Sequence, residues 1–194
     1  IFQTRHPILQ APNWPEAIYD LFKWHENYKT GEMMMMDQQR VEAGGLIYKD
    51  NIGMVGLICI PTQPGIGGRY FSKLADSGIH VELIVHLFDG YQCDHIMVCV
   101  DQDDFESALE ITQKIHEMVG SRTMIHDDQV ALVCISSLDF DESQVIAGHM
   151  FKTLGDNGIN IEGISTSVSS VTCMIHADDL DQALTVLRQA FILP

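Results

Sequence analysis

The stretch FSKLADSGIHVELI, residues 71–84, decides the fold, because the chain repeats it as FKTLGDNGINIEGI at residues 151–164. Phe, Leu, Asp, Gly, Ile, Glu and Ile recur at matching positions. A second pair, DDFESAL at 103–109 and DDLDQAL at 178–184, recurs downstream in the same order, after a shorter connection in the second copy. Self-similarity of this kind indicates one structural unit per copy. The chain is therefore a duplication.

The first copy has the pattern of a strand, a helix, two strands, a helix and a last strand. Runs of apolar and β-branched residues predict the strands, and apolar residues three or four apart predict the helices. The predicted ranges are a strand at 53–60, a helix at 67–76 ended by Gly78, strands at 81–88 and 95–100 with a tight turn at Asp89 and Gly90, a helix from 103 or 104 to 120 that buries Phe105, Leu109, Ile111, Ile115 and Met118, and a strand at 121–125.

The second copy repeats this order but has no sequence left for a last strand. An apolar segment upstream, residues 41–48, is the candidate for that strand, which would insert the first module within the second. Because β-α-β-β-α-β is the ferredoxin-like plan, we predict an α+β fold of two βαββαβ modules, the first inserted within the second. The predicted ranges of the second copy are strands at 130–136, 161–167 and 171–176 and helices within 141–154 and at 178–191, and the predicted domains are an N-terminal arm at 1–40, a first module at 53–127 and a second at 41–50 plus 128–194.

The predicted strands are apolar at most positions. Two helices cover only one face of such a sheet, and a sheet with one open face should alternate apolar and polar residues. We therefore expect the other face to be buried as well, against another copy or another chain.

Composition excludes several classes of function. Hydrophobic residues make up 46% of the 194 residues and charged residues 20%, which is typical of a globular protein with a core. The formal net charge of −16 disfavours nucleic acid as a partner, because an acidic surface repels phosphate. No apolar run approaches the roughly 20 residues of a membrane helix. Since no basic-then-apolar leader opens the sequence, we predict a cytoplasmic protein.

The five cysteines do not form a predicted disulfide framework. Their number is odd, and no CxxC spacing occurs. Four of them, Cys59, Cys99, Cys134 and Cys173, lie in apolar β-like runs. We therefore expect these four to be small buried hydrophobic residues in a reducing compartment.

Four stretches carry a resemblance to a known family: GGLIYKD at 44–50, PTQPG at 61–65, GINIEGISTS at 158–167 and DDLDQALTVL at 178–187. They resemble the tandem ACT domains that form the C-terminal regulatory region (beta-subunit type) of aspartate kinase, over about residues 41–193. The resemblance implies an inserted first module, a homodimer, and a small amino acid such as lysine or threonine bound near the module interfaces. It implies no kinase activity, because these residues contain no Gly-rich phosphate loop.

The resemblance also implies an effector site at the first strand–helix turn. There Gly65 permits a tight turn, and the N–H groups that open the next helix can hold a carboxylate; a tight turn without a ligand is the alternative reading. The implied effector-binding residues are Thr62, Gln63, Pro64, Gly65, Ile66, Gly67, Val85 and His86, with Asn160 and Ile161 from the other chain.

The chain departs from the family pattern at this site. The family often has Asp where Thr62 stands and Gln where His86 stands, and Thr cannot supply the charge that pairs with an ammonium group. The second copy has no Pro-Gly turn and instead contains LDFDES at 138–143. These departures put the identity of the effector in doubt.

The arm, residues 1–40, lies outside the resemblance. Its aromatic residues predict a helix that docks onto a larger partner or packs on the chain's own ACT pair. The four methionines at 33–36 are more typical of flexible apolar packing than of a Cu(I) site, and the nine His show no metal-ligand spacing. We predict no metal and no cofactor, and the predicted partner-docking residues are Trp14, Ile18, Phe22, Trp24 and Tyr28.

These observations predict a non-catalytic regulatory protein that binds a small amino acid between ACT modules and controls a partner. The alternative is a structural or assembly subunit, in which degenerate ACT modules serve as a dimerisation scaffold and the aromatic arm docks into a larger protein complex.

Overall fold

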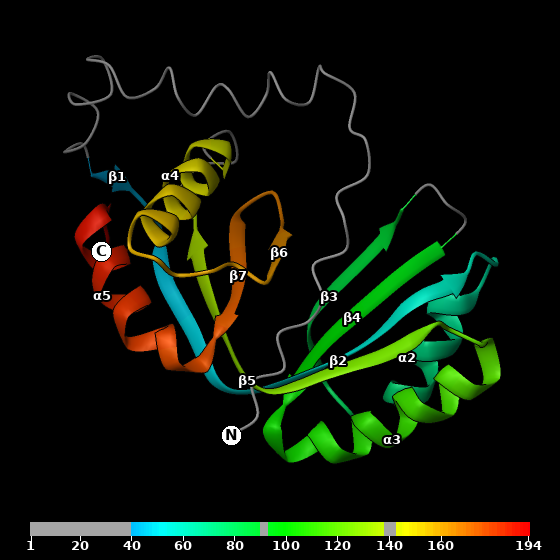
Figure 1. Cartoon of the computed structure of the whole chain (residues 1–194). Coiled ribbons are helices and arrows are strands. Elements are labelled where there is room, and N and C mark those ends of the chain that lie inside the picture. The colour runs from blue at the N-terminus through cyan, green and yellow to red at the C-terminus, as the bar shows by residue number, and fades with distance from the viewer. Residues whose placement is uncertain (1–39, 90–92, 138–142) are drawn as a thin grey trace. The chain divides into compact units, whose positions relative to one another are not determined.

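Two long strands, β2 (Gly45–Pro61) and β5 (Thr123–Ser136), run side by side through the whole of the unit formed by residues 40–194 (Figure 1). The computed structural model describes residues 40–89, 93–137 and 143–194. β2 and β5 are antiparallel neighbours at the centre of a six-stranded sheet with the order β3-β4-β2-β5-β7-β6. Each of the two strands therefore belongs to both halves of the sheet.

The first half of the sheet has the ferredoxin-like order. The second part of β2 leads into α2 (Ile66–Asp76), β3 (Val81–Phe88), β4 (Cys93–Asp101) and α3 (Gln102–Val119), and the first part of β5 closes it. Here Leu57 of β2 lies opposite Ile96 of β4 on one side and Met124 of β5 on the other.

The second half repeats this order with α4 (Ser143–Asp156), β6 (Gly163–Thr166), β7 (Ser170–His176), a short 3₁₀ helix (Ala177–Asp179) and α5 (Leu180–Ala190). The first part of β2 supplies its last strand, with Tyr48 opposite Val133. The predicted α+β fold, in which the first of two ferredoxin-like modules is inserted within the second, is confirmed.

The strands predicted separately at 121–125 and 130–136 form the single strand β5, and two further differences from the prediction lie at the ends of the second module. The predicted strand at 41–48 is broken, because Ala43 N–H donates to Ile192 O while Gly44 N–H donates to Ser136 O, so the chain changes partner between them. The residues before the break form β1 (Val41–Glu42), parallel to β8 (Phe191–Ile192). Phe191 therefore starts a short strand instead of ending the last helix.

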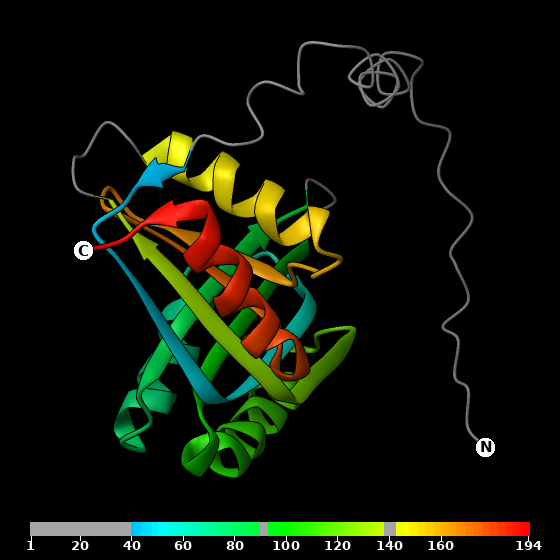
Figure 2. The same cartoon turned by 90° about the vertical axis from the view of Figure 1, so that its left-hand side faces the viewer.

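Each module has its own core beneath its two helices. α2 and α3 cover the first half of the sheet around Leu57, Tyr70 and Leu74, and α4 and α5 cover the second half around Ile146 and Leu187 (Figure 2). Met118, which we predicted to be buried by α3, is 61% exposed. The buried side chains of α3 are Phe105, Ala108, Thr112 and Ile115.

The sheet face opposite the helices is covered within the chain, by the other copy and not by another chain. A third cluster joins the two modules: Ile52 and Met54 from β2, Leu83, Cys99, Val130, Leu132 and Met174 are all buried there. The pairing of β2 with β5 shifts register on both sides of Ile52, and both strands change direction near mid-length (Figure 1). The two halves of the sheet thereby face one another. Apolar positions on both faces of these strands follow from this arrangement.

Among the described residues, no helix is long and apolar enough to span a bilayer.

Candidate functional site

The turn between β2 and α2 is built from Thr62 to Gly65. Gly65 has a φ of +88°, a left-handed conformation that glycine adopts without the steric cost of a side chain. No side chain caps this helix, and no acidic residue lies in its first turn. Ile66 N–H donates to Gln63 O, and Arg69 N–H donates to Gly65 O. The N–H groups of Gly67 and Gly68 then remain at a helix N-terminus for water or an anionic ligand.

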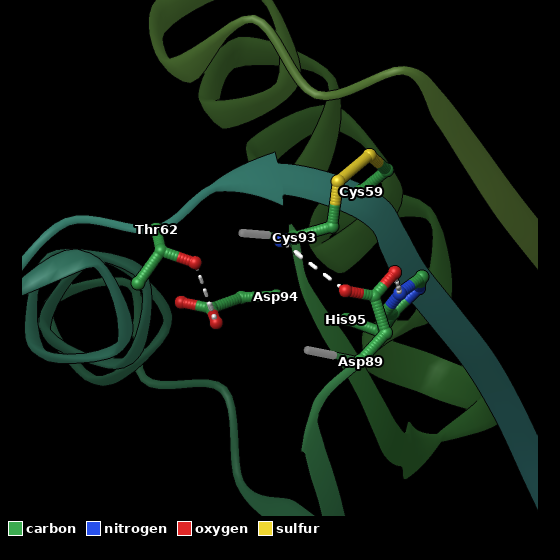
Figure 3. The surroundings of a disulfide bond; sticks show 6 residues. All are labelled: Cys59, Thr62, Asp89, Cys93, Asp94 and His95. Carbon is green, nitrogen blue, oxygen red and sulfur yellow. Dashed lines mark hydrogen bonds and ion pairs between the residues drawn. A yellow bond between two sulfur atoms is a disulfide. The ribbon is translucent and has the colours of Figure 1, made fainter. Parts of the chain in front are cut away.

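Beside this turn lies a pocket of about 480 Å³ lined by Thr62, His86, Phe88 and Asp94. The Thr62 Oγ1 hydroxyl donates to Asp94 Oδ1 at 3.2 Å (Figure 3). His86 Nε2 lies 3.8 Å from Asp94 Oδ2. Asp94 is only 7% exposed. A buried carboxylate thus faces a pocket next to a helix N-terminus, and this pairing suits a ligand with both a cationic and an anionic group.

The strands bring these side chains together. On β4, Asp94 lies opposite Ile60 of β2 and opposite Phe88 of β3. Thr62 follows β2 directly, and His86 lies two residues before Phe88 on the same strand. The pocket therefore forms where the ends of three adjacent strands meet.

The structure brings together only part of the predicted effector set. Thr62 and His86 share the pocket, and Gln63 and Pro64 are exposed on the turn. Ile66 points into the core of the first module. Gly65 and Gly67 lie at the start of α2. The last three predicted residues lie elsewhere in this chain: Val85 packs in the cluster between the modules, Ile161 packs against the core of the second module, and Asn160 is exposed.

The sequence patterns did not indicate Asp94 or Phe88 as site residues. A signal was present, because the tight turn predicted at Asp89 and Gly90 places Phe88 at the end of one strand and Asp94 near the start of the next, and the two residues are opposite one another in the structure. The resemblance directed attention to position 62, where the family's acid is missing. In the structure a carboxylate reaches the same place from the neighbouring strand β4.

Cys59 is not a free buried residue as predicted, because it forms a disulfide with Cys93 (Figure 3). The register of β2 against β4 shifts between Leu57 and Ile60. At this irregularity Cys59 adopts a φ of +54°, and its Cα lies 4.5 Å from that of Cys93. Neither the irregularity nor the strand register can be read from the sequence, so the sequence did not predict this disulfide.

The other three cysteines are free. Cys99 and Cys173 are fully buried as predicted, and burial raises the pKa of each thiol to about 12. Cys134 is half-buried. Among residues 40–89, 93–137 and 143–194, no group of three or more His, Cys, Asp and Glu side chains could hold a metal ion.

Comparison with known proteins shows which class of protein this chain resembles. Residues 139–191 match the ACT domain family. The regulatory subunit of aspartate kinase from Thermus thermophilus, in its ligand-free form, superposes with a TM-score of 0.71 at 29% identity, over 77% of this chain and 99% of that chain. The corresponding subunit from Thermus flavus gives 0.70 at 29% identity, over 78% and 99%. The chain thus has a segment that matches the ACT domain family and shares the fold of these regulatory subunits.

Within that class, the chain resembles the regulatory part of aspartate kinases. The aspartokinase of Thermus thermophilus is 29% identical over 172 residues, which are 86% of this chain and 42% of that protein. The aspartate kinase of Synechocystis superposes with a TM-score of 0.72 at 27% identity, over 78% of this chain and 28% of that one. The chain therefore spans less than half the length of these relatives. Its similarity to the Thermus regulatory subunits supports a regulatory role.

Several predictions fall on residues that the structure does not describe. These are the docking residues Trp14, Ile18, Phe22, Trp24 and Tyr28, the methionines at 33–36, the turn at Gly90 and most of the LDFDES segment.

Proposed function

We propose that the chain is a non-catalytic regulatory protein that binds a small amino acid in the Thr62–His86–Phe88–Asp94 pocket and thereby controls a partner protein. The observation that carries the proposal is the buried Asp94 carboxylate, which accepts a hydrogen bond from Thr62 on the turn that leads into α2. A free amino acid has an ammonium group for Asp94 and a carboxylate for the N–H groups of Gly67 and Gly68. Lysine and threonine, which the resemblance implies, are the first candidates.

In this proposal Asp94 supplies the negative charge that Thr62 lacks. The family's acid at position 62 would pair with the ammonium group, and Thr62 has no charge. The Thr62 hydroxyl instead donates a hydrogen bond to Asp94 Oδ1 at 3.2 Å. The negative charge beside position 62 is therefore carried by Asp94. Lined by His86 and Phe88, the pocket would select the side chain of the amino acid.

We further propose that two copies associate through the edges of the sheet. β3 and β6 are its edge strands, and an edge strand presents unpaired backbone groups that a second copy can bond. Ile84, Leu87 and Phe88 on β3 are 46%, 57% and 55% exposed, and Ile164 on β6 is 41% exposed. In such a dimer Asn160 and Ile161, which precede β6, would approach the pocket of the other copy.

We also propose that the first module spans residues 53–127 and that the second spans residues 41–50 and 128–194.

The proposal is tested by titrating the purified chain with each amino acid and following its melting temperature. Lysine or threonine should stabilise the chain in a concentration-dependent way, as any ligand of the native state does. Asp94→Asn should weaken this binding at least tenfold, because it removes the charge that pairs with the ammonium group. Glu106→Gln, an exposed acid on α3, is the matched control and should bind as the unmodified chain does.

Equal affinity in Asp94→Asn and the unmodified chain would show that Asp94 does not contact the ligand. If no amino acid raises the melting temperature at millimolar concentration and the chain sediments as a dimer, the assembly-subunit alternative is favoured. The exposed apolar side chains of β3 are the observation that favours this alternative.

A further inference from the structure

The Cys59–Cys93 disulfide and the pocket occupy the same end of the sheet (Figure 3). Cys59 lies three residues before Thr62, and Cys93 immediately precedes Asp94. The disulfide and the Thr62–Asp94 hydrogen bond thus connect the same two strand ends, β2 and β4. The disulfide is covalent, whereas the Thr62–Asp94 contact is a single hydrogen bond between side chains, and backbone pairing of Ile60 with Asp94 and of Pro61 with Cys93 joins the two strands as well.

The bridged cysteines are accessible. Cys59 and Cys93 are both half-buried, whereas Cys99 and Cys173 are fully buried. Thiol–disulfide exchange begins with the attack of a thiolate on a disulfide sulfur, so it requires access to that sulfur. The bridge is therefore less shielded from an external thiol than the fully buried thiols of Cys99 and Cys173 are.

The backbone at Cys59 is held in an unfavourable conformation. Among the described residues, Cys59 is the only residue other than glycine with a positive φ, and this conformation is costly for a residue with a side chain. Its carbonyl accepts a hydrogen bond of 3.1 Å from Arg122 N–H. When the sulfur–sulfur bond opens, the conformation loses its covalent support, and residues 59–62 are free to relax.

The hairpin on the other side of the bridge has an anchor of its own. Asp89 Oδ1 accepts a hydrogen bond from Cys93 N–H, and Asp89 N–H donates to Cys93 O at 3.1 Å. Opening the bridge therefore leaves the base of the β3–β4 hairpin in place. The loss of the disulfide therefore affects the connection between β2 and β4, and with it the distance from Thr62 to Asp94.

We propose that Cys59 and Cys93 form a reversible dithiol–disulfide site that raises the ligand affinity of the neighbouring pocket when it is oxidised. The control of affinity rests on the proposed amino-acid binding, whereas the redox site itself does not. In the oxidised state the bridge holds Asp94 beside Thr62. In the reduced state this end of β2 is held to β4 only by the backbone pairing of Ile60 with Asp94 and of Pro61 with Cys93 and by the Thr62–Asp94 hydrogen bond. We expect affinity to fall about tenfold, within the usual range of coupling between two sites.

The exchange reaction balances with small thiols as reductant. A thiolate attacks one bridge sulfur and displaces the other as a thiolate, which takes up a proton. A second thiol then resolves the mixed disulfide. Two electrons and two protons pass to Cys59 and Cys93, and the reductant leaves as its own disulfide. Glutathione disulfide, acting in the reverse direction, is the oxidant that closes the bridge again.

The redox site is tested without any ligand by equilibrating the chain in glutathione buffers of graded ratio. Alkylation and mass spectrometry then count the free thiols. As the glutathione ratio changes, the free thiols of Cys59 and Cys93 should appear and disappear together, in a single step of two thiols. The segment containing Thr62 to Gly67 should exchange its amide hydrogens faster in the reduced form. A pair that stays reduced, or stays bridged, at every ratio would overturn the proposal.

Coupling to the pocket is tested by titrating lysine and threonine into the oxidised and reduced forms of the same chain. Oxidised chain should bind about tenfold more tightly. The double variant Cys59→Ser with Cys93→Ser should match the reduced form under all conditions, and Cys134→Ser, which removes a free cysteine, should keep the full redox response. Equal affinity in both forms would disprove the coupling.

The two proposals fail in different ways. If neither amino acid binds in either form while the two-thiol step and the faster exchange are observed, the redox site stands and the amino-acid function falls. If binding is present but independent of the buffer ratio, the amino-acid function stands and the redox control falls.

Discussion

Tyr70 and Thr112 form the buried polar contact that joins the two helices of the first module. Both residues are fully buried. The Thr112 hydroxyl donates to Ala108 O at 2.7 Å, so the Tyr70 hydroxyl is the donor in the 2.6 Å contact between the two side chains. All the polar atoms of this contact are therefore satisfied, as burial requires. Burial raises the pKa of Tyr70 to about 12.

Tyr70→Phe should cost about 1 kcal/mol of stability at pH 8, the net value of one buried hydrogen bond. The difference should vanish or reverse by pH 11. The folded chain holds the Tyr70 proton up to a pKa of about 12, whereas the unfolded chain loses it near 10. The stability of the unmodified chain therefore falls with rising pH between these values, by about 1.4 kcal/mol for each unit of pKa difference.

Urea unfolding of both chains at pH 8 and pH 11 measures this effect. Since other groups titrate equally in the two chains, only the difference between them reports on Tyr70. A difference that stays constant with pH would contradict the pKa assignment.

At the scale of elements, α3 lies directly on β2 at a glycine. A Cβ at Gly53 would lie 2.2 Å from Phe105 Cδ2 and 2.8 Å from its Cγ. Phe105 begins the buried side of α3 and is only 5% exposed. Glycine at position 53 thus sets how closely the helix approaches the sheet.

Gly53→Ala should destabilise the chain by about 1–3 kcal/mol, because the added methyl displaces Phe105 from a packed core. Gly148→Ala is the control. Gly148 lies on the exposed side of α4 with nothing within 4 Å of an added Cβ, so alanine should stabilise it by up to about 1 kcal/mol through helix propensity. Denaturant midpoints of the two variants give both values. A neutral Gly53→Ala would show that α3 can move away at little cost.

At the scale of the whole unit, the two modules are one folding unit because they share strands. β2 and β5 each pass through both modules, and the cluster around Ile52, Leu83 and Met174 is built from both. Neither module can lose its structure without exposing apolar side chains of the other.

We therefore predict that both modules unfold in one transition. Cys99 on β4 lies in the cluster between the modules and Cys173 on β7 lies in the core of the second module, and both thiols are buried in the native state. Pulsed alkylation along a urea series, read by mass spectrometry, should show the same midpoint for both. Two midpoints that differ beyond error would show that the core of the second module unfolds separately from the cluster between the modules.

The sequence by itself determined the duplication, the order of strands and helices, and the insertion of one module within the other. These follow from local signals: a repeated 14-residue pattern at 71–84 and 151–164, apolar periodicity, and glycines such as Gly120 that end a helix. Thr62 and His86 were placed at one site because the resemblance supplied their relation.

Tertiary structure alone decided three features: the approach of Asp94 to Thr62, the pairing of Cys59 with Cys93, and the burial of the second sheet face within one chain. All three depend on strand register and on an irregularity in β2. Register is a relation between segments distant in sequence, fixed by packing of the whole unit, so no local pattern of residues contains it.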